Sequence, residues 1–272
     1  MSRSLPAFVL LLAATALLAG CDRDGAGQSA AGSDPASAGQ ASRTPLAYTS
    51  KTPYAAIELK LPPSLKAYPT LHSALYAEEV RQLRQFAEGA QGERTEAGFP
   101  ADMPPYSKDI AIDAMFDGKR LLSLRRADFD FSGGAHPNTL HSGILWDKAE
   151  QRRLAPADLF LKGADLSVLD QALCTAVNSA KRERAPDSPG VTLDGGEFSC
   201  PRAATTPFVL ASSDQPGRAA GLTFLIDPYQ VGPYVEGAYA IDIPLSVFRS
   251  LLNPEYASEF GGRFSSDGAA RR

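Results

Sequence analysis

Residues 110–131 read IAIDAMFDGKRLLSLRRADFDF, and this stretch decides the fold because it predicts two adjacent antiparallel strands. Apolar residues occupy every second position before residue 117, which is the period of a strand with one buried face. Asp117-Gly118 follows, and this dipeptide favours the positive φ angles of a tight hairpin turn. The return strand begins near Leu122. A β-hairpin is therefore the first element of the predicted fold.

Apolar periodicity on both sides of this hairpin predicts further strands and helices. Strands are expected at 57–61, 139–147, 222–226 and 239–243, and helices at 71–87, 156–160, 165–184 and 245–252. Gly89 is expected to end the first helix, and a Gly/Pro-rich loop is expected over 89–105. Short turns join strands directly while the helices arrive separately. This order predicts an α+β fold with antiparallel sheet(s) and helices packed on one face.

The first twenty residues have the features of a secretory leader. Arg3 precedes an apolar run that is too short to span a bilayer as a permanent helix. The run ends in Leu18-Ala19-Gly20-Cys21, which resembles a lipobox and predicts cleavage before Cys21 and lipidation of its thiol. The alternative is an ordinary secretory signal with a chance cysteine. The sequence therefore predicts a lipoprotein that carries palmitate on Cys21 and is anchored at the periplasmic face of a membrane. Asp22 slightly favours the inner membrane over the outer membrane.

Composition sets the limits of the folded region. Residues 21–52 are rich in Gly, Ala, Ser and Gln and predict a flexible tether, and residues 255–272 predict a disordered tail. Without Arg3 the mature chain has 26 basic and 31 acidic residues, evenly mixed. No basic stripe is present, which argues against nucleic acid as a partner.

Two cysteines remain after Cys21. Cys174 and Cys200 predict a disulfide, because thiols in an oxidising compartment rarely stay unpaired. By closing the loop between them, this bond is expected to stabilise the fold by roughly 3 kcal/mol on the chain-entropy model. The alternatives are two free thiols or two metal ligands that lack further partners.

Three motifs carry a family resemblance: SGGAHPN at 132–138, LAPADLF at 154–160 and FLIDPYQVGPYVEG at 224–237. Together they resemble domain-of-unknown-function family 3298, which implies an RsiV-like domain over 129–254. The preceding segment, 53–128, is similar to the companion family 4163, a PdaC-like domain.

This resemblance implies binding. The same pair of domains forms the extracytoplasmic part of RsiV-like anti-sigma factors, which sense lysozyme by binding it, and precedes some peptidoglycan deacetylases. The present chain shows no cytoplasmic sigma-binding segment and no deacetylase domain, so neither activity is carried over. What remains is a sensing or binding part on a lipid tether.

The motif around His136 has two interpretations. His136, with His141 and Asp130 nearby, invites a metal or catalytic role, but zinc needs three or four converging ligands. Gly133, Gly134 and Pro137 instead have the chemistry of a tight turn, in which His136 and Asn138 bond the backbone. We favour the turn and predict neither a metal site nor a catalytic residue. A Ser/His/Asp triad from Ser132 or Ser142, His136 and Asp130 lacks the nucleophile-elbow motif.

The segment from 228 to 239 is rich in tyrosine. Tyr229, Tyr234 and Tyr239, with Pro228 and Pro233, predict an aromatic rim for binding, because tyrosine combines a large apolar ring with a polar end. The alternative is a loop packed on the sheet edge by its own rings. The candidate ligand-binding residues are Gly133, Gly134, His136, Pro137, Asn138, Tyr229, Pro233 and Tyr234.

These observations predict a non-enzymatic envelope lipoprotein that binds a cell-wall-related ligand, either a lysozyme-type protein or peptidoglycan, without a cofactor. The alternatives are an envelope hydrolase centred on His136 and a structural or assembly lipoprotein that binds another envelope protein.

Overall fold

The structure is a computed structural model that describes residues 42–100 and 103–265. The leader, Cys21 and Asp22 lie outside the described residues. None of the described helices combines the length and apolarity that a membrane crossing requires.

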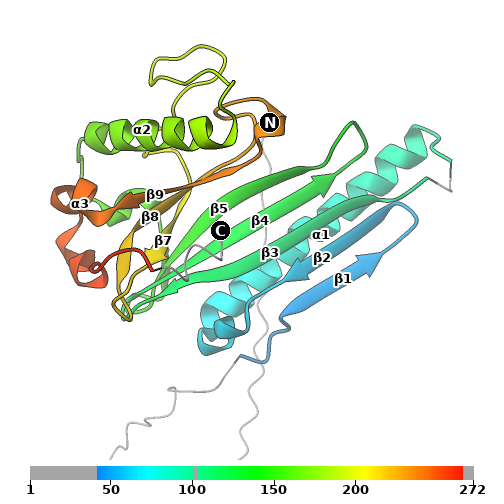
Figure 1. Cartoon of the computed structure of the whole chain (residues 1–272). Helices are drawn as coiled ribbons and strands as arrows, with labels where there is room; N and C mark the ends of the chain where they lie inside the picture. Colours follow the sequence, from blue (N-terminus) through cyan, green and yellow to red (C-terminus); the bar gives the residue numbers. More distant parts are fainter. Residues whose placement is uncertain (1–41, 101–102, 266–272) are drawn as a thin grey trace, which may run out of the picture. The chain divides into compact units, whose positions relative to one another are not determined.

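A six-stranded sheet forms the larger part of the fold (Figure 1). In order across the sheet its strands are β1 (Ala47–Lys51), β2 (Ala55–Lys60), β3 (Tyr106–Asp117), β4 (Leu121–Phe131), β5 (Asn138–Asp147) and β6 (Arg152–Leu154). All neighbours pair antiparallel except β2 and β3, which are parallel. Parallel neighbours need a crossover connection, and helix α1 (Pro69–Glu96) provides it.

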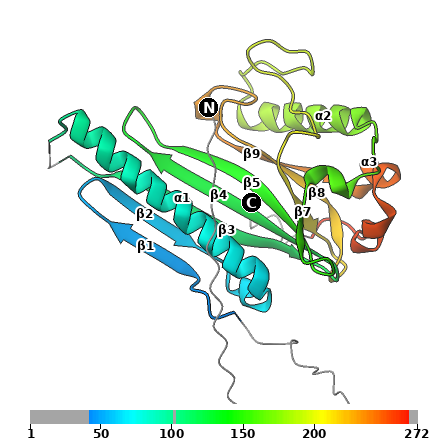
Figure 2. The ribbon, with the colours of Figure 1, turned by 180° about the vertical axis from the view of Figure 1, so that it is seen from behind.

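Helix α1 covers one face of this sheet, as Figure 2 shows. Its apolar residues recur three or four positions apart, so Leu71, Leu75 and Leu83 are fully buried on one side of the helix. They share a core with alternate residues of the strands, including Ile110 and Leu124.

A second sheet of three antiparallel strands carries the remaining helices. It contains β7 (Phe208–Ser212), β8 (Ala219–Ile226) and β9 (Tyr239–Pro244), with α2 (Ser167–Arg184) and α3 (Leu245–Phe248) packed on it. Short 3₁₀ segments complete the fold: η1 (Pro63–Ala67), η2 (Pro156–Leu159), η3 (Tyr234–Glu236), η4 (Arg249–Leu251) and η5 (Pro254–Glu259).

The two sheets meet closely at β5 and β7. A Cβ built on Gly143 would lie 1.8 Å from the Phe208 carbonyl oxygen, so only glycine allows this approach. Beside it, the Ser123 hydroxyl on β4 accepts a 3.0 Å hydrogen bond from the Leu210 backbone N–H. The sheets therefore share one core at this end of β3–β5.

The predicted α+β class is confirmed, and the predicted strands and main helices are present. Two expectations about the extent of helices are wrong. Helix α1 does not end at Gly89 but continues to Glu96, because Ala90 and Arg94 are buried and Arg94 donates to the Pro104 and Met103 carbonyls. The expected closing helix at 245–252 divides into α3 and η4.

Both predicted unstructured ends contain ordered residues. Strand β1 lies within the expected tether, and Tyr48 packs against the α1 core. In the expected tail, Tyr256 and Phe260 are buried in the core around α2 and α3. Polar composition concealed these segments, because a few well-placed rings are enough to fix them. Residues 21–41 of the expected tether and 266–272 of the expected tail lie outside the described residues.

The predicted boundary between residues 128 and 129 falls inside β4. The six-stranded sheet takes strands from both sides of that position, and the described residues on both sides of it belong to one compact unit.

Cys174 and Cys200 form the predicted disulfide, with their Cα atoms 5.1 Å apart. It joins the middle of α2 to the end of the loop that follows the helix.

Candidate functional site

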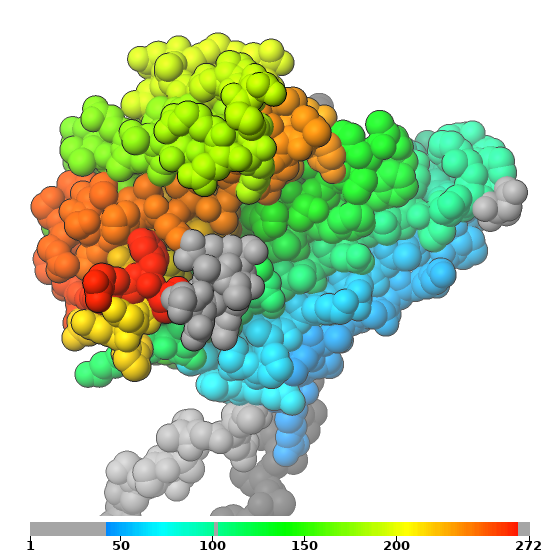
Figure 3. Space-filling view, in the orientation of Figure 1, coloured from blue at the N-terminus to red at the C-terminus, as the bar shows by residue number. Residues whose placement is uncertain are grey.

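The two motifs singled out in the sequence meet in space. The imidazole of His136 stacks on the Tyr234 ring, with centroids 3.7 Å apart and planes inclined by 17°. Tyr229 completes the group at 6.2 Å from His136 and 5.6 Å from Tyr234. We call His136, Tyr229 and Tyr234 the ring cluster. Figure 3 shows the orange segment around residue 235 lying against the green β4–β5 region.

The loop between β4 and β5 presents His136 through its glycines. Gly133 and Gly134 have φ values of 81° and 115°, a region that residues with a side chain rarely adopt. The predicted turn chemistry is therefore present. Ser132 donates a 2.8 Å hydrogen bond to Asp130 and closes the base of the loop.

Hydrogen bonds fix the rings of the cluster. His136 Nδ1 lies 2.9 Å from the Pro137 carbonyl oxygen, which only accepts, so Nδ1 carries a proton. In the neutral ring, Nε2 then accepts from the Tyr229 hydroxyl at 3.1 Å. Tyr234 donates to the same Pro137 carbonyl at 2.8 Å. Both motifs thus converge on one peptide oxygen.

Tyr229 holds an unusual backbone conformation. Its φ is 69°, in the left-handed region, while 55% of the residue is exposed. A left-handed conformation costs a residue with a side chain roughly 1–2 kcal/mol. This strain places a large ring at the surface, where it contributes little to the core.

A buried ion pair anchors the tyrosine-rich loop to α2. Lys181 and Glu236 lie 2.7 Å apart, and both side chains are almost fully buried. Burial would raise the pKa of Glu236, but hydrogen bonds from Lys181, Ser188 and Tyr239, together with the lysine charge, lower it below its usual value. Burial, then the bond to Glu236, raises the pKa of Tyr239 to about 12.

A second tie joins this loop to β5. The buried carboxylate of Asp227 accepts from the His141 backbone N–H at 3.0 Å and from His141 Nδ1 at 2.8 Å. The bond to Asp227 fixes the orientation of the imidazole, because Nδ1 faces the carboxylate and Nε2 is on the opposite edge of the ring.

The structure distributes the other predicted residues unevenly. The prediction that Tyr239 belongs to an aromatic rim is wrong, because this residue is only 2% exposed and its hydroxyl donates to Glu236. In the residues considered for a triad, Ser132 bonds Asp130 while both His136 nitrogens have other partners. Within 42–100 and 103–265, no three or more His, Cys, Asp or Glu residues are grouped as a metal site would require.

Sequence reasoning missed the polar residues that hold the site together. Lys181, Glu236 and Asp227 are far apart in sequence and resemble ordinary surface charges there. The only signal is that Asp227 and Glu236 flank Tyr229 and Tyr234 in the motif at 224–237.

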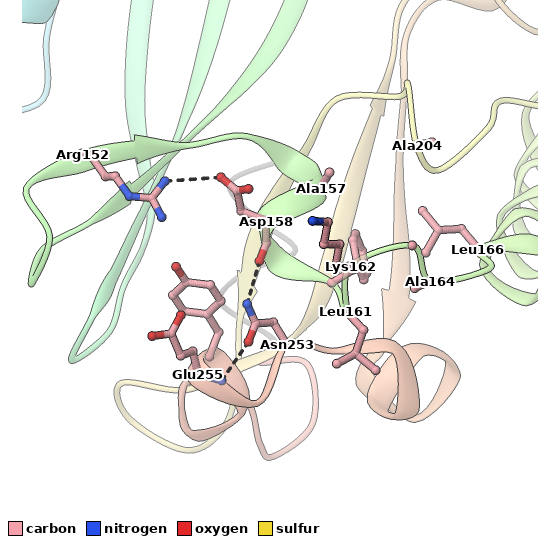
Figure 4. Close-up of a pocket in the computed structure, with 13 residues that line it drawn as sticks. Arg152, Ala157, Asp158, Leu161, Lys162, Ala164, Leu166, Ala204, Asn253 and Glu255 are labelled. Carbon is pink, nitrogen blue, oxygen red and sulfur yellow. Dashed lines mark hydrogen bonds and ion pairs between the residues drawn. The ribbon is translucent and has the colours of Figure 1, made fainter.

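A cavity of about 580 Å³ lies elsewhere, beside η2 and η5 (Figure 4). The motif at 154–160 supplies part of its lining. Its polar groups bond one another: Arg152 pairs with Asp158 at 3.4 Å, and Asn253 bridges the Asp158 carbonyl and the Glu255 N–H. Since Arg152, Asp158 and Asn253 already have partners within the protein, the ring cluster is the stronger candidate site.

Comparison with known proteins identifies similar folds but no similar sequences. No protein-family model matches the chain, and no curated protein matches it in sequence. A solved structure of a DUF3298 family member from Bacteroides fragilis is 20% identical, with a TM-score of 0.51 over 78% of this chain and 93% of that one. A DUF3298 family protein from Pseudomonas aeruginosa is 17% identical, with a TM-score of 0.50 over 80% and 94%.

The chain has the DUF3298 fold. This finding supports the resemblance to family 3298 that the sequence motifs predicted. In this fold the ring cluster lies where the loop after β4 meets the loop after β8. The RsiV-like and PdaC-like parts of the resemblance stay predictions.

Proposed function

We propose that the chain is a non-enzymatic binding module for a cell-wall-related ligand, held at the periplasmic face of a membrane by lipid on Cys21. The ring cluster is the observation that carries the binding proposal. The lipid anchor rests on the leader and lipobox alone.

The ring cluster suits recognition because its geometry is set in advance. Each ring has a hydrogen bond that fixes its direction, so little side-chain entropy is lost when a ligand arrives. The exposed Tyr229 offers an apolar ring face and a polar hydroxyl. A sugar ring has the matching surface, with C–H groups on its face and hydroxyls at its edge. Peptidoglycan glycan is therefore the ligand we place first, and a lysozyme-type protein, which rests on the family resemblance, is second.

The test is calorimetric titration of the full chain with soluble peptidoglycan fragments and, separately, with lysozyme. We expect Tyr234→Ala to weaken binding at least tenfold, because it removes the ring under His136 and one bond to Pro137. Tyr76→Ala, a half-buried tyrosine on α1, is the matched control and should bind as the wild type does.

Three results would count against the proposal. Binding of neither probe removes both ligands, and equal weakening by Tyr76→Ala removes the ring cluster as the site. Release of cleaved products from the fragments would instead support the alternative of a hydrolase.

A further inference from the structure

We infer that an apolar pocket beside the tyrosine-rich loop binds the acetamido group of an N-acetylated sugar. The pocket has a volume of about 490 Å³, within the range of roughly 300–1,000 Å³ that small-molecule sites have. It lies between residues 231–236, the last turn of α2 and the loop that follows this helix. The inference rests on the proposed function and deepens it, because it names the kind of sugar that the ring cluster and this pocket bind together.

The walls of the pocket are apolar. Its polar side chains are the buried pair of Lys181 and Glu236 and the neighbouring Ser188, and these three bond one another. Every other lining residue is a glycine or has an apolar side chain, including Phe198 on one side and Val235 on the other. Such walls favour an uncharged ligand group with an apolar part, because a charged group there would lose its water without gaining a partner.

Two backbone N–H groups at the pocket have no partner. Val231 and Gly232 are buried and line the pocket, yet neither N–H has a hydrogen-bond acceptor within residues 42–100 and 103–265. Buried backbone N–H groups in folded proteins nearly always have an acceptor, supplied by the chain, by water or by a ligand. The described chain therefore leaves two adjacent donors for an acceptor oxygen at the pocket.

An acetamido group matches both features. Its carbonyl oxygen accepts hydrogen bonds, its methyl group is apolar, and the group carries no charge. A hydroxyl at the same position of a sugar has no methyl group to place against the apolar walls. The glycan of peptidoglycan consists of N-acetylated amino sugars, so the ligand that we place first carries the group that the pocket fits.

One wall of the pocket is in place before a ligand arrives. Asn178 Oδ1 accepts from the Val191 backbone N–H at 2.8 Å, and Asn178 Nδ2 donates to the Val191 carbonyl at 2.8 Å. The disulfide between Cys174 and Cys200 joins the end of the same loop to α2. Because this loop is fixed to the helix, little conformational entropy is lost when the pocket is filled.

The pocket and the ring cluster share one loop. Tyr229 precedes Val231 by two positions, a span of at most about 7 Å. Tyr234 lies between two residues that line the pocket, Pro233 and Val235. Figure 3 shows the orange segment around residue 235 between the green β4–β5 region and the yellow-green region of α2 and the loop after it. Neighbouring sugar units of one oligosaccharide therefore reach both the rings and the pocket.

Chitotriose and cellotriose form a matched pair of probes, because both are β-1,4-linked trisaccharides and they differ in having an acetamido or a hydroxyl group at C2 of each sugar. N-Methylacetamide is a third probe that carries the acetamido group without a sugar. We expect NMR titration of the full chain to show chitotriose binding about tenfold more tightly than cellotriose, from one or two hydrogen bonds and a buried methyl group. Chitotriose and N-methylacetamide should both shift the backbone amide signals of Val231 and Gly232.

The variant Val235→Ser tests the apolar wall. Val235 is 89% exposed, so the fold is expected to stay intact while the contact with the methyl group is lost. The preference for chitotriose should fall about threefold, and cellotriose binding should stay unchanged. Val168→Ser is the matched control, because Val168 is a 57% exposed valine near the opposite end of α2 and should keep the full preference.

The outcomes separate the two proposals. If both trisaccharides bind with equal affinity and Tyr234→Ala weakens both, the proposed function stands and the acetamido pocket is overturned. If N-methylacetamide shifts the Val231 and Gly232 signals while neither trisaccharide binds, the acetamido pocket stands and the saccharide ligand fails. Chitotriose binding that leaves both amide signals in place, or a full preference in Val235→Ser, also overturns the pocket.

Discussion

At Tyr229 a strained backbone and an exposed ring occur in the same residue. A side chain kept in the left-handed region at the surface is hard to explain by packing, because the ring is more than half exposed. A binding role would explain both the strain and the hydrogen bond to His136, because both hold the ring at the surface in one orientation.

Two substitutions separate the strain from the ring. Tyr229→Ala removes the ring and keeps a Cβ in the strained conformation, whereas Tyr229→Gly removes both. We expect the glycine variant to be more stable than the alanine variant by about 1 kcal/mol, measured by urea unfolding. Both should lose ligand binding to the same extent. A glycine variant no more stable than the alanine variant would show that residue 229 carries no strain.

The sequence predicted the ring cluster only in part. His136 and the glycines before it stand out because turn chemistry is local. Their partners Tyr229 and Tyr234 come from a loop more than 90 positions later, and no periodicity indicates which rings meet. Tyr239 shows the limit: Tyr229 is exposed and Tyr239, ten positions later, is buried, and only the position of Glu236 decides between them.

Among the elements, α2 and the tyrosine-rich loop depend on the buried pair of Lys181 and Glu236. Glu236→Gln leaves the lysine charge buried without its counterion, which costs about 3–5 kcal/mol. We expect a large loss of unfolding free energy at pH 7. Glu183→Gln is the control, because Glu183 is exposed on α2, the helix that carries Lys181; this substitution should change the free energy of unfolding little. An equally small effect of both substitutions would contradict the assigned role of the pair.

The pH dependence of this pair has a definite sign. The folded state lowers the pKa of Glu236, so its contribution is fully present above its usual pKa, about 4.5, and is lost as the pH falls through the lowered value. The stability difference between wild type and Glu236→Gln should therefore shrink below pH 4.5 in acid unfolding curves. A difference that stays constant down to pH 2 would rule out this linkage.

Glycines in different elements should respond oppositely to alanine. Gly92 lies inside α1, and a Cβ added there would meet no atom within 4 Å outside its own stretch of helix, so Gly92→Ala should stabilise the protein by about 0.5–1 kcal/mol. Gly143→Ala, where β5 approaches β7, should destabilise it by about 1–3 kcal/mol or prevent folding. Thermal unfolding of the two variants measures both effects. A destabilised Gly92→Ala variant would contradict the open surroundings of that residue.

At the scale of the whole molecule, the disulfide between Cys174 and Cys200 is the main covalent constraint on the described fold. Replacing both cysteines by serine should reduce the free energy of unfolding by about 3 kcal/mol, since the bridge closes a loop of 26 residues. Urea unfolding with and without reductant checks this value. The wild-type protein under reductant should match the double variant; a variant as stable as the oxidised protein would contradict it.

Features that depend on residues close together in the sequence could be predicted, whereas contacts between distant residues could not. The β3–β4 hairpin and helices α1 and α2 follow from periodicity and turn residues, which are local. The parallel pairing of β2 with β3 and the contact of β5 with β7 are long-range, so they had no sequence signature beyond Gly143. Strand β1 was missed because an edge strand needs few apolar residues.

Strand β4 crosses the boundary expected from family resemblance, and this has a consequence for chimeras. A cut at residue 128 would leave the last residues of the hairpin on the other fragment and expose unpaired backbone along β3. Fragments divided there should aggregate. Chimeras with related proteins therefore have to exchange the β3–β4 hairpin as one piece. Crossover points between the two parent sequences should lie in loops outside this hairpin.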